Sequence, residues 1–369
     1  MIYVAKPPVP ERHRLEYYLD QVYDSRQLTN NGPLVQLFTE RLGQFLGIKN
    51  LLLVSNGTLA LQIALAALGI KKHGANVVTT PFSFVATTSS IVWESLQPRF
   101  ADIDAKSLCL DPVKLSAVID KNTRAVLPVH VYGNACDIDA IESVAYRAGL
   151  RTLYDGSHCF GVRFKGKSIL ECGDASTLSL HATKLFHCVE GGLITFRETK
   201  DLERARKMIN FGYDKGQISC LGINAKMSEL HAAFGLAMLD EVNILLEGRQ
   251  RVWERYQKSF EHCVQLPRFH ADATQNFSYF AIVLSDEATA DRIEARCKSI
   301  GVIIRRYFSP SLNELAYIDH VQSCPVSESL SRRTVCLPVY GELAKDDQDR
   351  IISMVKLELT SETICQLAS

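Results

Sequence analysis

The chain has 369 residues, equal numbers of basic and acidic side chains (41 of each) and a hydrophobic fraction of 47%. This length and composition are sufficient for a large buried core and for two domains of ordinary size. Because the formal net charge is zero and like charges never run five or six in a row, the composition predicts no nucleic-acid partner and no anionic membrane partner. Any anion-binding site must therefore be local.

The cysteines and the amino-terminal segment indicate a cytoplasmic protein. The eleven cysteines are scattered, odd in number and without a Cys-x-x-Cys pair, which is typical of reduced thiols. The first eight residues lack the apolar region of a signal peptide. The most apolar stretch, residues 51–68, is interrupted by polar residues and a glycine, so we expect no membrane span.

From about residue 50 to about residue 200, short apolar runs alternate with helical patterns. This alternation predicts an α/β sheet that is largely parallel. The expected strands are residues 51–54, 76–79, 98–101, 124–128, 150–154, 175–180 and 193–196. Several of them end in polar or glycine-rich turns, where open α/β sheets usually bind ligands.

The pattern changes in the last third of the chain. Residues 225–260 are helical in pattern, with Gly248 as the expected break. We therefore expect a large α/β domain over residues 1–248 and a smaller α+β domain over residues 249–369. The expected elements of the smaller domain are strands at 279–284, 302–306 and 334–337 and helices at 287–299 and 345–357.

Three local features occur in an order that predicts one cofactor site. Lys184 follows the strand at 175–180 and precedes two glycines, and an amine at this position suggests a Schiff base. Upstream, Asp155 closes the strand that begins at 150, where a carboxylate can keep a pyridine nitrogen protonated. The segment 55–58 (SNGT) opens an apolar helix after a strand, and a helix N-terminus that follows a glycine turn binds phosphate. Together these features indicate pyridoxal phosphate chemistry.

The sequence resembles the sugar aminotransferases of the DegT/DnrJ/EryC1/StrS family nearly from end to end. The resemblance is carried by residues 28–33 (LTNNGP), 55–61 (SNGTLAL), 80–87 (TPFSFVAT), 128–133 (PVHVYG), 155–158 (DGSH), 179–184 (SLHATK) and 222–227 (GINAKM). It implies fold type I of the pyridoxal-phosphate-dependent transferases, with a mostly parallel seven-stranded sheet flanked by helices and a smaller C-terminal α+β domain.

Within the family, residues 29–33, 181–184 and 226–227 look like the branch that aminates dTDP-4-keto-6-deoxyglucose at C4. The resemblance implies a transaminase of EC 2.6.1 type that takes the amino group of L-glutamate, stores it as pyridoxamine phosphate and delivers it to the sugar. The expected product is dTDP-4-amino-4,6-dideoxyglucose or its galactose epimer, used in cell-surface glycans such as the lipopolysaccharide O-antigen.

Other functions remain open from the sequence. The closest is a 3-aminotransferase of a dTDP-3-keto-6-deoxyhexose. A dehydratase of the same family characteristically carries histidine in place of the Schiff-base lysine, so Lys184 argues against it. The remaining alternative is a non-enzymatic, cofactor-bound regulatory protein.

By the same resemblance, Lys184 forms the Schiff base and moves protons, and Asp155 pairs with the pyridinium nitrogen. The other implied cofactor contacts are Gly57, Thr58 and Ser179 at the phosphate, Phe82 on the ring face, His158 at the phenolic oxygen, and Asn224 at the phosphate of the neighbouring subunit in a homodimer. Thr29 is an implied sugar contact, and Arg305, Arg306 and Tyr307 are candidates for the nucleotide or diphosphate.

Each motif also has a plainer interpretation, and two positions depart from the family pattern. The SNGT segment can be an ordinary helix cap, and Phe82 can be a core residue. Gly156 and Ser157 stand where relatives commonly carry two alanines, and Lys226 stands where many carry arginine. A metal site built from the histidines and cysteines around residues 158–188 is not expected, because their spacing matches no zinc pattern.

Overall fold

The computed structural model describes the backbone of residues 1–70, 74–319 and 322–367. Within these ranges, it describes the side chains up to residue 360. A seven-stranded sheet in the order β1-β9-β8-β5-β4-β2-β3 forms its centre. The strands are β1 (Leu51–Val54), β2 (Asn76–Thr79), β3 (Gln97–Phe100), β4 (Thr123–Leu127), β5 (Arg151–Asp155), β8 (Ala175–Ser179) and β9 (Gly192–Phe196). Only β9 runs against its neighbours β1 and β8, so the prediction of seven mostly parallel strands is confirmed.

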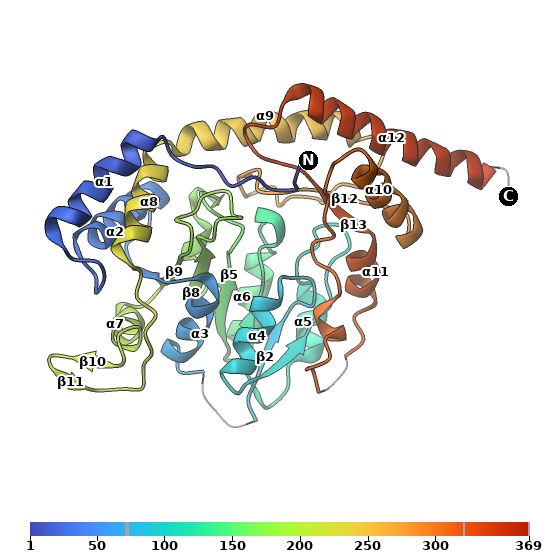
Figure 1. Cartoon of the computed structure of the whole chain (residues 1–369). Coiled ribbons are helices and arrows are strands. Elements are labelled where there is room, and N and C mark those ends of the chain that lie inside the picture. The colour runs from blue at the N-terminus through green and yellow to red at the C-terminus, as the bar shows by residue number, and fades with distance from the viewer. Residues whose placement is uncertain (71–73, 320–321, 368–369) are drawn as a thin grey trace.

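Helices cover both faces of this sheet, because successive strand residues point to opposite sides. In β1, Leu51 and Leu53 belong to one core cluster, whereas Leu52 and Val54 belong to another. The first cluster includes residues of α1 (Arg12–Ser25), α2 (Pro33–Leu46), α5 (Pro112–Val118), α6 (Ile138–Arg147) and α8 (Glu229–Asp240). The second includes residues of α3 (Gly57–Ala67), α4 (Val85–Trp93) and α7 (Thr199–Met208) (Figure 1).

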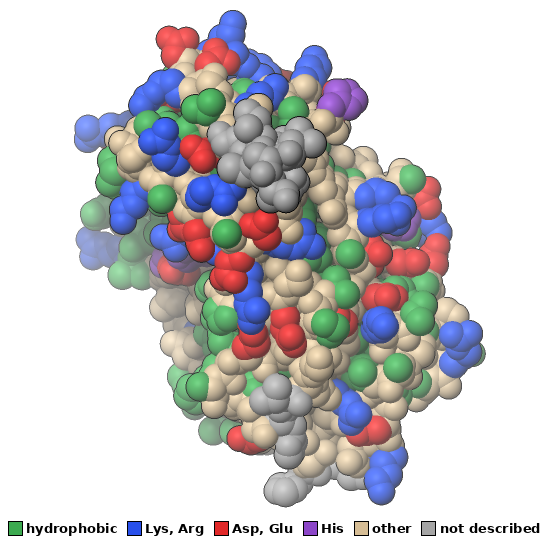
Figure 2. All heavy atoms as spheres, turned by 90° about the vertical axis from the view of Figure 1, so that its right-hand side faces the viewer, with side chains coloured by type: hydrophobic (Ala, Val, Ile, Leu, Met, Phe, Trp, Pro, Cys, Tyr) green, Lys and Arg blue, Asp and Glu red, His purple; other side chains and the backbone are tan. Residues whose placement is uncertain are grey.

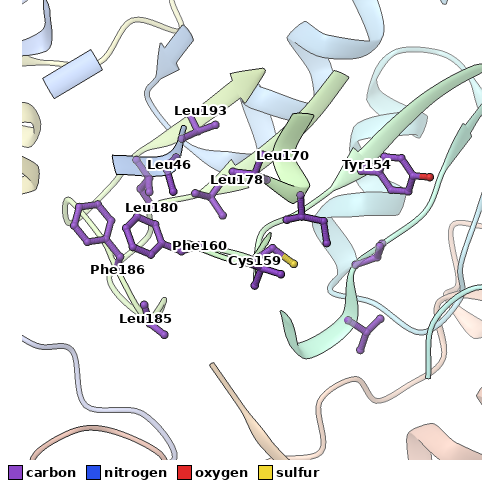
Figure 3. Packing of buried hydrophobic residues seen from close by; sticks show 14 of the residues in the cluster. Leu46, Tyr154, Cys159, Phe160, Leu170, Leu178, Leu180, Leu185, Phe186 and Leu193 are labelled. Carbon is purple, nitrogen blue, oxygen red and sulfur yellow. The ribbon is translucent and has the colours of Figure 1, made fainter. Parts of the chain in front are cut away.

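The first core cluster extends beneath the loop between β8 and β9. Leu180, Leu185 and Phe186 of this loop are buried together with Phe160 (Figure 3). The rings of Phe160 and Phe186 stack with their centroids 4.3 Å apart. The loop is therefore fixed by apolar packing on both sides of Lys184.

The last third of the chain has its own apolar cluster. The antiparallel pair β12 (Phe280–Val283) and β13 (Thr334–Leu337) packs in it with α9 (Val242–Phe260), α10 (Glu287–Ser299) and α12 (Lys345–Leu367). The start of the chain also packs here, since the N–H of Ile2 donates to the carbonyl of Gly301 at 2.8 Å. The smaller elements are α11 (Pro325–Arg333), the two-residue strands β6 (Arg163–Phe164), β7 (Lys167–Ser168), β10 (Tyr213–Asp214) and β11 (Gln217–Ile218), and the 3₁₀ turns η1 (Val131–Gly133), η2 (Ile169–Glu171) and η3 (Leu312–Glu314).

Two expectations for this region are wrong. Gly248 does not break a helix: α9 runs through it, and a Cβ at Gly248 would lie 2.9 Å from the Cα of Gly341, so the glycine permits close packing of two backbones. The expected strand at 302–306 is reduced to isolated bridges at Val302 and Arg305. The predicted domain boundary after residue 248 falls inside α9, and the division into two domains stays a prediction.

The surface carries charges of both signs. On the face shown in Figure 2, basic and acidic side chains are interspersed and neither sign dominates, consistent with the zero net charge. Among the helices of the described residues, none is long and apolar enough to cross a bilayer.

Candidate functional site

Lys184 lies in a loop that is closed by backbone hydrogen bonds between its two arms. The N–H of Leu180 donates to the carbonyl of Gly191 at 2.8 Å, and the N–H of Ala182 donates to that of Val189 at 2.8 Å. The side chain of Lys184 is partly buried, and this burial lowers the pKa of its amine to about 8, while the charge of Asp155 acts to raise it. Burial therefore favours the neutral, nucleophilic form of this amine relative to an exposed lysine.

Asp155 is a buried carboxylate, 4% exposed, at the carboxyl end of β5. Its Oδ2 accepts a hydrogen bond from the hydroxyl of Thr87 at 2.8 Å, and its Oδ1 accepts from the N–H and the hydroxyl of Ser157 at 3.0 and 2.6 Å. Among the described residues, no Lys, Arg or His nitrogen lies within 4.0 Å of it. A carboxylate has about four lone-pair directions, so one remains for a further donor.

The Ser157 hydroxyl bond gives a physical meaning to one departure from the family pattern, because alanine at this position has no hydroxyl to donate. Its neighbour Gly156 is tightly packed: a Cβ there would lie 2.6 Å from Cδ2 of Leu170 and 3.0 Å from the carbonyl oxygen of Thr177. The pair Gly156 and Ser157 therefore suits the local packing of this chain.

His158 is buried and electrically neutral. Burial, with a smaller contribution from the charge of Lys184, lowers its pKa well below 6.5. Its Nδ1 accepts a hydrogen bond from the N–H of Tyr132 at 3.2 Å, so the single ring proton of the neutral imidazole is on Nε2. Tyr132 itself holds a left-handed conformation (φ 58°), which costs energy in a non-glycine residue. The strained turn thus orients His158 as a donor through Nε2.

Aromatic rings surround this histidine. Phe308, from the loop after α10, stacks on the His158 ring with centroids 5.6 Å apart and meets the Phe82 ring edge-on at 5.8 Å. Tyr279 approaches His158 edge-on at 5.0 Å. Phe82 is fully buried, so it lies in the core as well as beside the candidate site.

The start of α3 lies against the end of β8. A Cβ on Gly57 would lie 2.9 Å from the Cβ of Ser179, so only glycine allows this approach. Asn56 caps the helix by accepting from the N–H of Leu59 at 2.8 Å. The N–H groups of Gly57 and Thr58 precede the first intrahelical bond and make no backbone hydrogen bond within the described chain, so they are available to an anion beside the Ser179 hydroxyl.

Thr29 and Asn224 do not contact these residues within one chain. Both are exposed, and the segments that carry them meet at a different place. Asn224 forms a bridge with Asn210, whose side chain accepts from Lys226 at 3.0 Å. A cavity of ≈ 430 Å³ in this region is lined by Asn30, Asn31, Asn210, Lys226 and Met227 among others, and by none of Asp155, His158 and Lys184.

Sequence reasoning missed several residues of the site. Thr87 lies in a quoted motif but had no role assigned, and its hydrogen bond to Asp155 becomes visible only when β5 and α4 are placed side by side. Phe308 and Tyr279 come from the last third of the chain, and no local motif marks them. Arg305 is exposed and Arg306 pairs with acidic side chains of α10, including Asp291.

A model of the DegT/DnrJ/EryC1/StrS aminotransferase family matches residues 11–356 of the chain. Among curated proteins, the dTDP-4-amino-4,6-dideoxy-D-glucose transaminase of Shigella dysenteriae is 37% identical over 363 residues, covering 96% of this chain and 98% of the relative. The protein of the same name from Escherichia coli is 33% identical over 367 residues, covering 96% and 97%.

Solved structures show the same similarity. The structure of DesI, described as being in the presence of its TDP-sugar product, superposes with a TM-score of 0.92 at 32% sequence identity. The match covers 100% of this chain and 96% of that chain, so it includes both the sheet and the smaller C-terminal part.

Proposed function

Because this chain belongs to the DegT/DnrJ/EryC1/StrS aminotransferase family, and is thus a sugar aminotransferase, we propose that it transfers the amino group of L-glutamate to C4 of dTDP-4-keto-6-deoxyglucose. The expected product is a dTDP-4-amino-4,6-dideoxyhexose. The names of the two relatives at 33% and 37% identity support this choice of sugar. The observation that carries the aminotransferase chemistry is the placement of Lys184, in the loop between β8 and β9, near the buried carboxylate of Asp155 at the end of β5.

The residues of the site fit pyridoxal phosphate. Asp155 is a buried carboxylate with a free lone pair and without a cation within 4.0 Å among the described residues, which suits a protonated pyridine nitrogen. The Gly57 approach to Ser179 leaves two helix amides and a hydroxyl for a phosphate group. His158 presents a donor through Nε2, which suits a phenolic oxygen. When bound there, the cofactor supplies an electron sink for carbanion chemistry.

In this proposal the residues of the chain have separate tasks. With the cofactor bound, Lys184 Nζ would be the amine that holds it and the group that moves a proton to and from the donor carbon. Thr87 and Ser157 fix the carboxylate of Asp155, and Tyr132 fixes His158 in one tautomer. The aromatic rings of Phe82 and Phe308 exclude water from this region, since both are at least 95% buried.

We further propose that the protein is a homodimer with shared sites. In one chain, the segments of Thr29 and Asn224 meet each other but not Lys184. A second copy can place Asn224 at the phosphate and Thr29 beside the sugar of its neighbour, as the sequence motifs imply. The exposed loop that carries Asn224 is compatible with this role.

The test uses the purified protein with pyridoxal phosphate, L-glutamate and dTDP-4-keto-6-deoxyglucose. Cofactor absorbance follows the reaction with glutamate, and NMR identifies the sugar product. We expect a 4-amino sugar from the wild type and none from Lys184→Ala. If glutamate converts the cofactor but this sugar is not aminated, the choice of sugar is wrong and the 3-keto isomer is the next substrate. If Lys184→Ala retains full activity, the role of Lys184 is wrong.

A further inference from the structure

Arg249 is a buried cation without an anionic partner in the described part of the chain. It lies on α9 and is 5% exposed. Its Nη1 donates to the carbonyl of Ser278 at 3.0 Å, and among the described residues no Asp or Glu oxygen lies within 4.0 Å of it. Burial lowers the pKa of its guanidinium to about 10, which leaves it charged at neutral pH. Buried charges are normally paired, so this one indicates an anion from outside the chain.

The guanidinium lines a small pocket beside the loop of Lys184. Thr183, the residue before Lys184, lies on its wall, together with Tyr279 and Tyr307. Several of the other lining residues are apolar, including Leu337 and Val339 of the β13 region. The pocket is therefore a positive site with a largely apolar lining, beside the loop that carries Lys184.

This pocket shares a wall with the cofactor site. The Tyr279 ring contacts the ring of His158 edge-on at 5.0 Å and that of Tyr307 edge-on at 5.7 Å. The backbone carbonyl of Tyr307 accepts a hydrogen bond from the hydroxyl of Tyr132, whose N–H orients His158. The Arg249 pocket and the candidate cofactor site are therefore neighbours, since Tyr279 lines the pocket and also contacts His158.

The tyrosines add hydrogen-bond donors to the charge. Within the described residues, neither the Tyr279 nor the Tyr307 hydroxyl has a hydrogen-bond partner. Burial raises the pKa of both hydroxyls, that of Tyr307 to about 12, so each keeps its proton at neutral pH. Two phenol donors and a guanidinium match the acceptor oxygens of a carboxylate.

The volume of the pocket limits which part of a substrate can enter it. Its volume is ≈ 20 Å³, room for about one water-sized group. Sites for whole nucleotide-sugar-sized molecules are hundreds of cubic ångströms, on the order of 300–1,000 Å³. The pocket is too small for the nucleotide or the sugar, and it has room only for a terminal group such as one oxygen of a carboxylate.

We propose that Arg249, with the hydroxyls of Tyr279 and Tyr307, binds a carboxylate of the amino donor and so selects an acidic amino acid. This inference rests on the proposed function, in which the donor is L-glutamate. Arginine suits the position because its planar fork can make two parallel hydrogen bonds to one carboxylate, which lysine cannot.

The two half-reactions of an aminotransferase provide the test, because only the first involves the donor. In Arg249→Gln, we expect the KM for L-glutamate to rise about 10- to 100-fold, the loss of a charged hydrogen bond. The reaction of the aminated enzyme with the keto sugar should change less than about twofold. Arg249→Lys should recover only part of the loss, since it restores the charge without the fork. The matched control is Arg251→Gln, an exposed arginine on the same helix, which should leave both half-reactions unchanged.

A binding measurement without turnover separates this inference from the proposed function. Glutarate has two carboxylates and no amine, so its binding to the cofactor-free protein, followed by calorimetry, measures carboxylate binding without turnover, and the Arg249→Gln variant identifies the part due to this pocket. We expect the wild type and Arg251→Gln to bind glutarate and Arg249→Gln not to bind it. If the wild type binds glutarate through Arg249 but does not react with glutamate, the donor in the proposed function is wrong while the carboxylate site stands.

Two results would overturn the inference. If Arg249→Gln slows both half-reactions equally and lowers the melting temperature, Arg249 is only a tether for the Ser278 carbonyl. If sulfate binds at Arg249 but the KM for glutamate is unchanged in Arg249→Gln, the pocket is a general anion site and not a donor site.

Discussion

The Lys184 amine experiences two opposed effects. Burial lowers its pKa from 10.5 to about 8, and the Asp155 charge limits that decrease. In the folded, cofactor-free protein, the amine should therefore lose its proton as the pH rises through about 8, and its reaction with an amine reagent should rise over the same range. In urea-unfolded protein, the midpoint should move to about 10.4. Mass spectrometry of the Lys184 peptide measures the extent of labelling in the folded and in the unfolded protein. Equal pH midpoints in the two states would contradict the burial effect.

Thr87 and Thr88 form a natural pair for testing the support of Asp155. Both side chains are buried, but only the Thr87 hydroxyl donates to Asp155, whereas that of Thr88 has no hydrogen-bond partner among the described residues. Thr87→Val should weaken cofactor binding about tenfold, because one hydrogen bond to a charged group is lost. Thr88→Val should bind the cofactor normally, since it removes a hydroxyl that makes no bond.

The readout for this pair is the dissociation constant of pyridoxal phosphate, measured by absorbance titration, with the melting temperature as a check on folding. If cofactor binding is weakened equally in Thr87→Val and Thr88→Val, the loss comes from general packing around α4 and not from the hydrogen bond to Asp155. The same design extends to Ser157→Ala, which removes a second hydroxyl from this carboxylate.

At the scale of elements, α2 begins against a carboxylate that belongs to α8. Glu229, 1% exposed, accepts from the N–H of Leu34 at 2.7 Å and from that of Val35 at 3.2 Å. These are helix N-terminal N–H groups without intrahelical partners, so a negative side chain stabilises them twice, by hydrogen bonds and by the helix dipole. The contact also fixes the turn at Gly32, where a Cβ would lie 2.7 Å from Cδ of Glu229.

Glu229→Ala should lower the free energy of unfolding by about 2–4 kcal/mol, because two buried donors lose their acceptor. The free energy of unfolding of Glu229→Gln should lie between those of Glu229→Ala and the wild type, since the amide keeps one acceptor oxygen. Glu203→Ala, on the exposed side of α7, should change the free energy of unfolding by less than about 0.5 kcal/mol. Urea denaturation of the cofactor-free protein measures all three, and a loss in Glu229→Ala no larger than in the control would contradict the capping role.

The strands of the main sheet were predictable to within one residue, and apart from the edge strand β3, where Gln97 is exposed, they are mostly buried along their length. Such strands are continuous apolar runs that end in polar turns, and the sequence shows both features directly. Gly248 was misjudged for a related reason: glycine lowers helix propensity, but its close approach to Gly341 depends on a segment distant in sequence. Propensity is local, whereas the packing that outweighs it is not.

The same distinction applies to the site. Asp155 ends β5, and Gly57 and Lys184 come shortly after β1 and β8, so their order along the chain indicates one site before any coordinates are known. Phe308 and Arg249 reach that crevice from other elements, and their roles depend on tertiary contacts that no spacing reveals. The sequence therefore indicates the residues that we propose to hold the cofactor, but not those that we propose to surround the substrates.

At the scale of the whole molecule, one segment extends away from the body. The β10–β11 hairpin projects beyond α7 (Figure 1), and its region carries exposed apolar side chains, including Ile218 (68% exposed) and Leu221 (82% exposed). Exposed apolar groups beside the candidate phosphate contact Asn224 favour contact with a second copy of the chain. In the proposed dimer, burial of this arm would bring Asn224 toward the cofactor site of the neighbouring subunit.

Complementation between two inactive variants tests whether the sites are shared. Lys184→Ala subunits lack the amine but keep Asn224, and Asn224→Ala subunits keep the amine but lack the amide. If Asn224 serves the neighbouring subunit, each mixed dimer contains one complete site and one that lacks both groups. Random exchange at equal concentrations makes half of the dimers mixed, so the mixture should recover about a quarter of the wild-type activity, assuming independent sites. If Asn224 instead serves its own subunit, every site lacks one group, and the activity of the mixture will not exceed the average of the two variants.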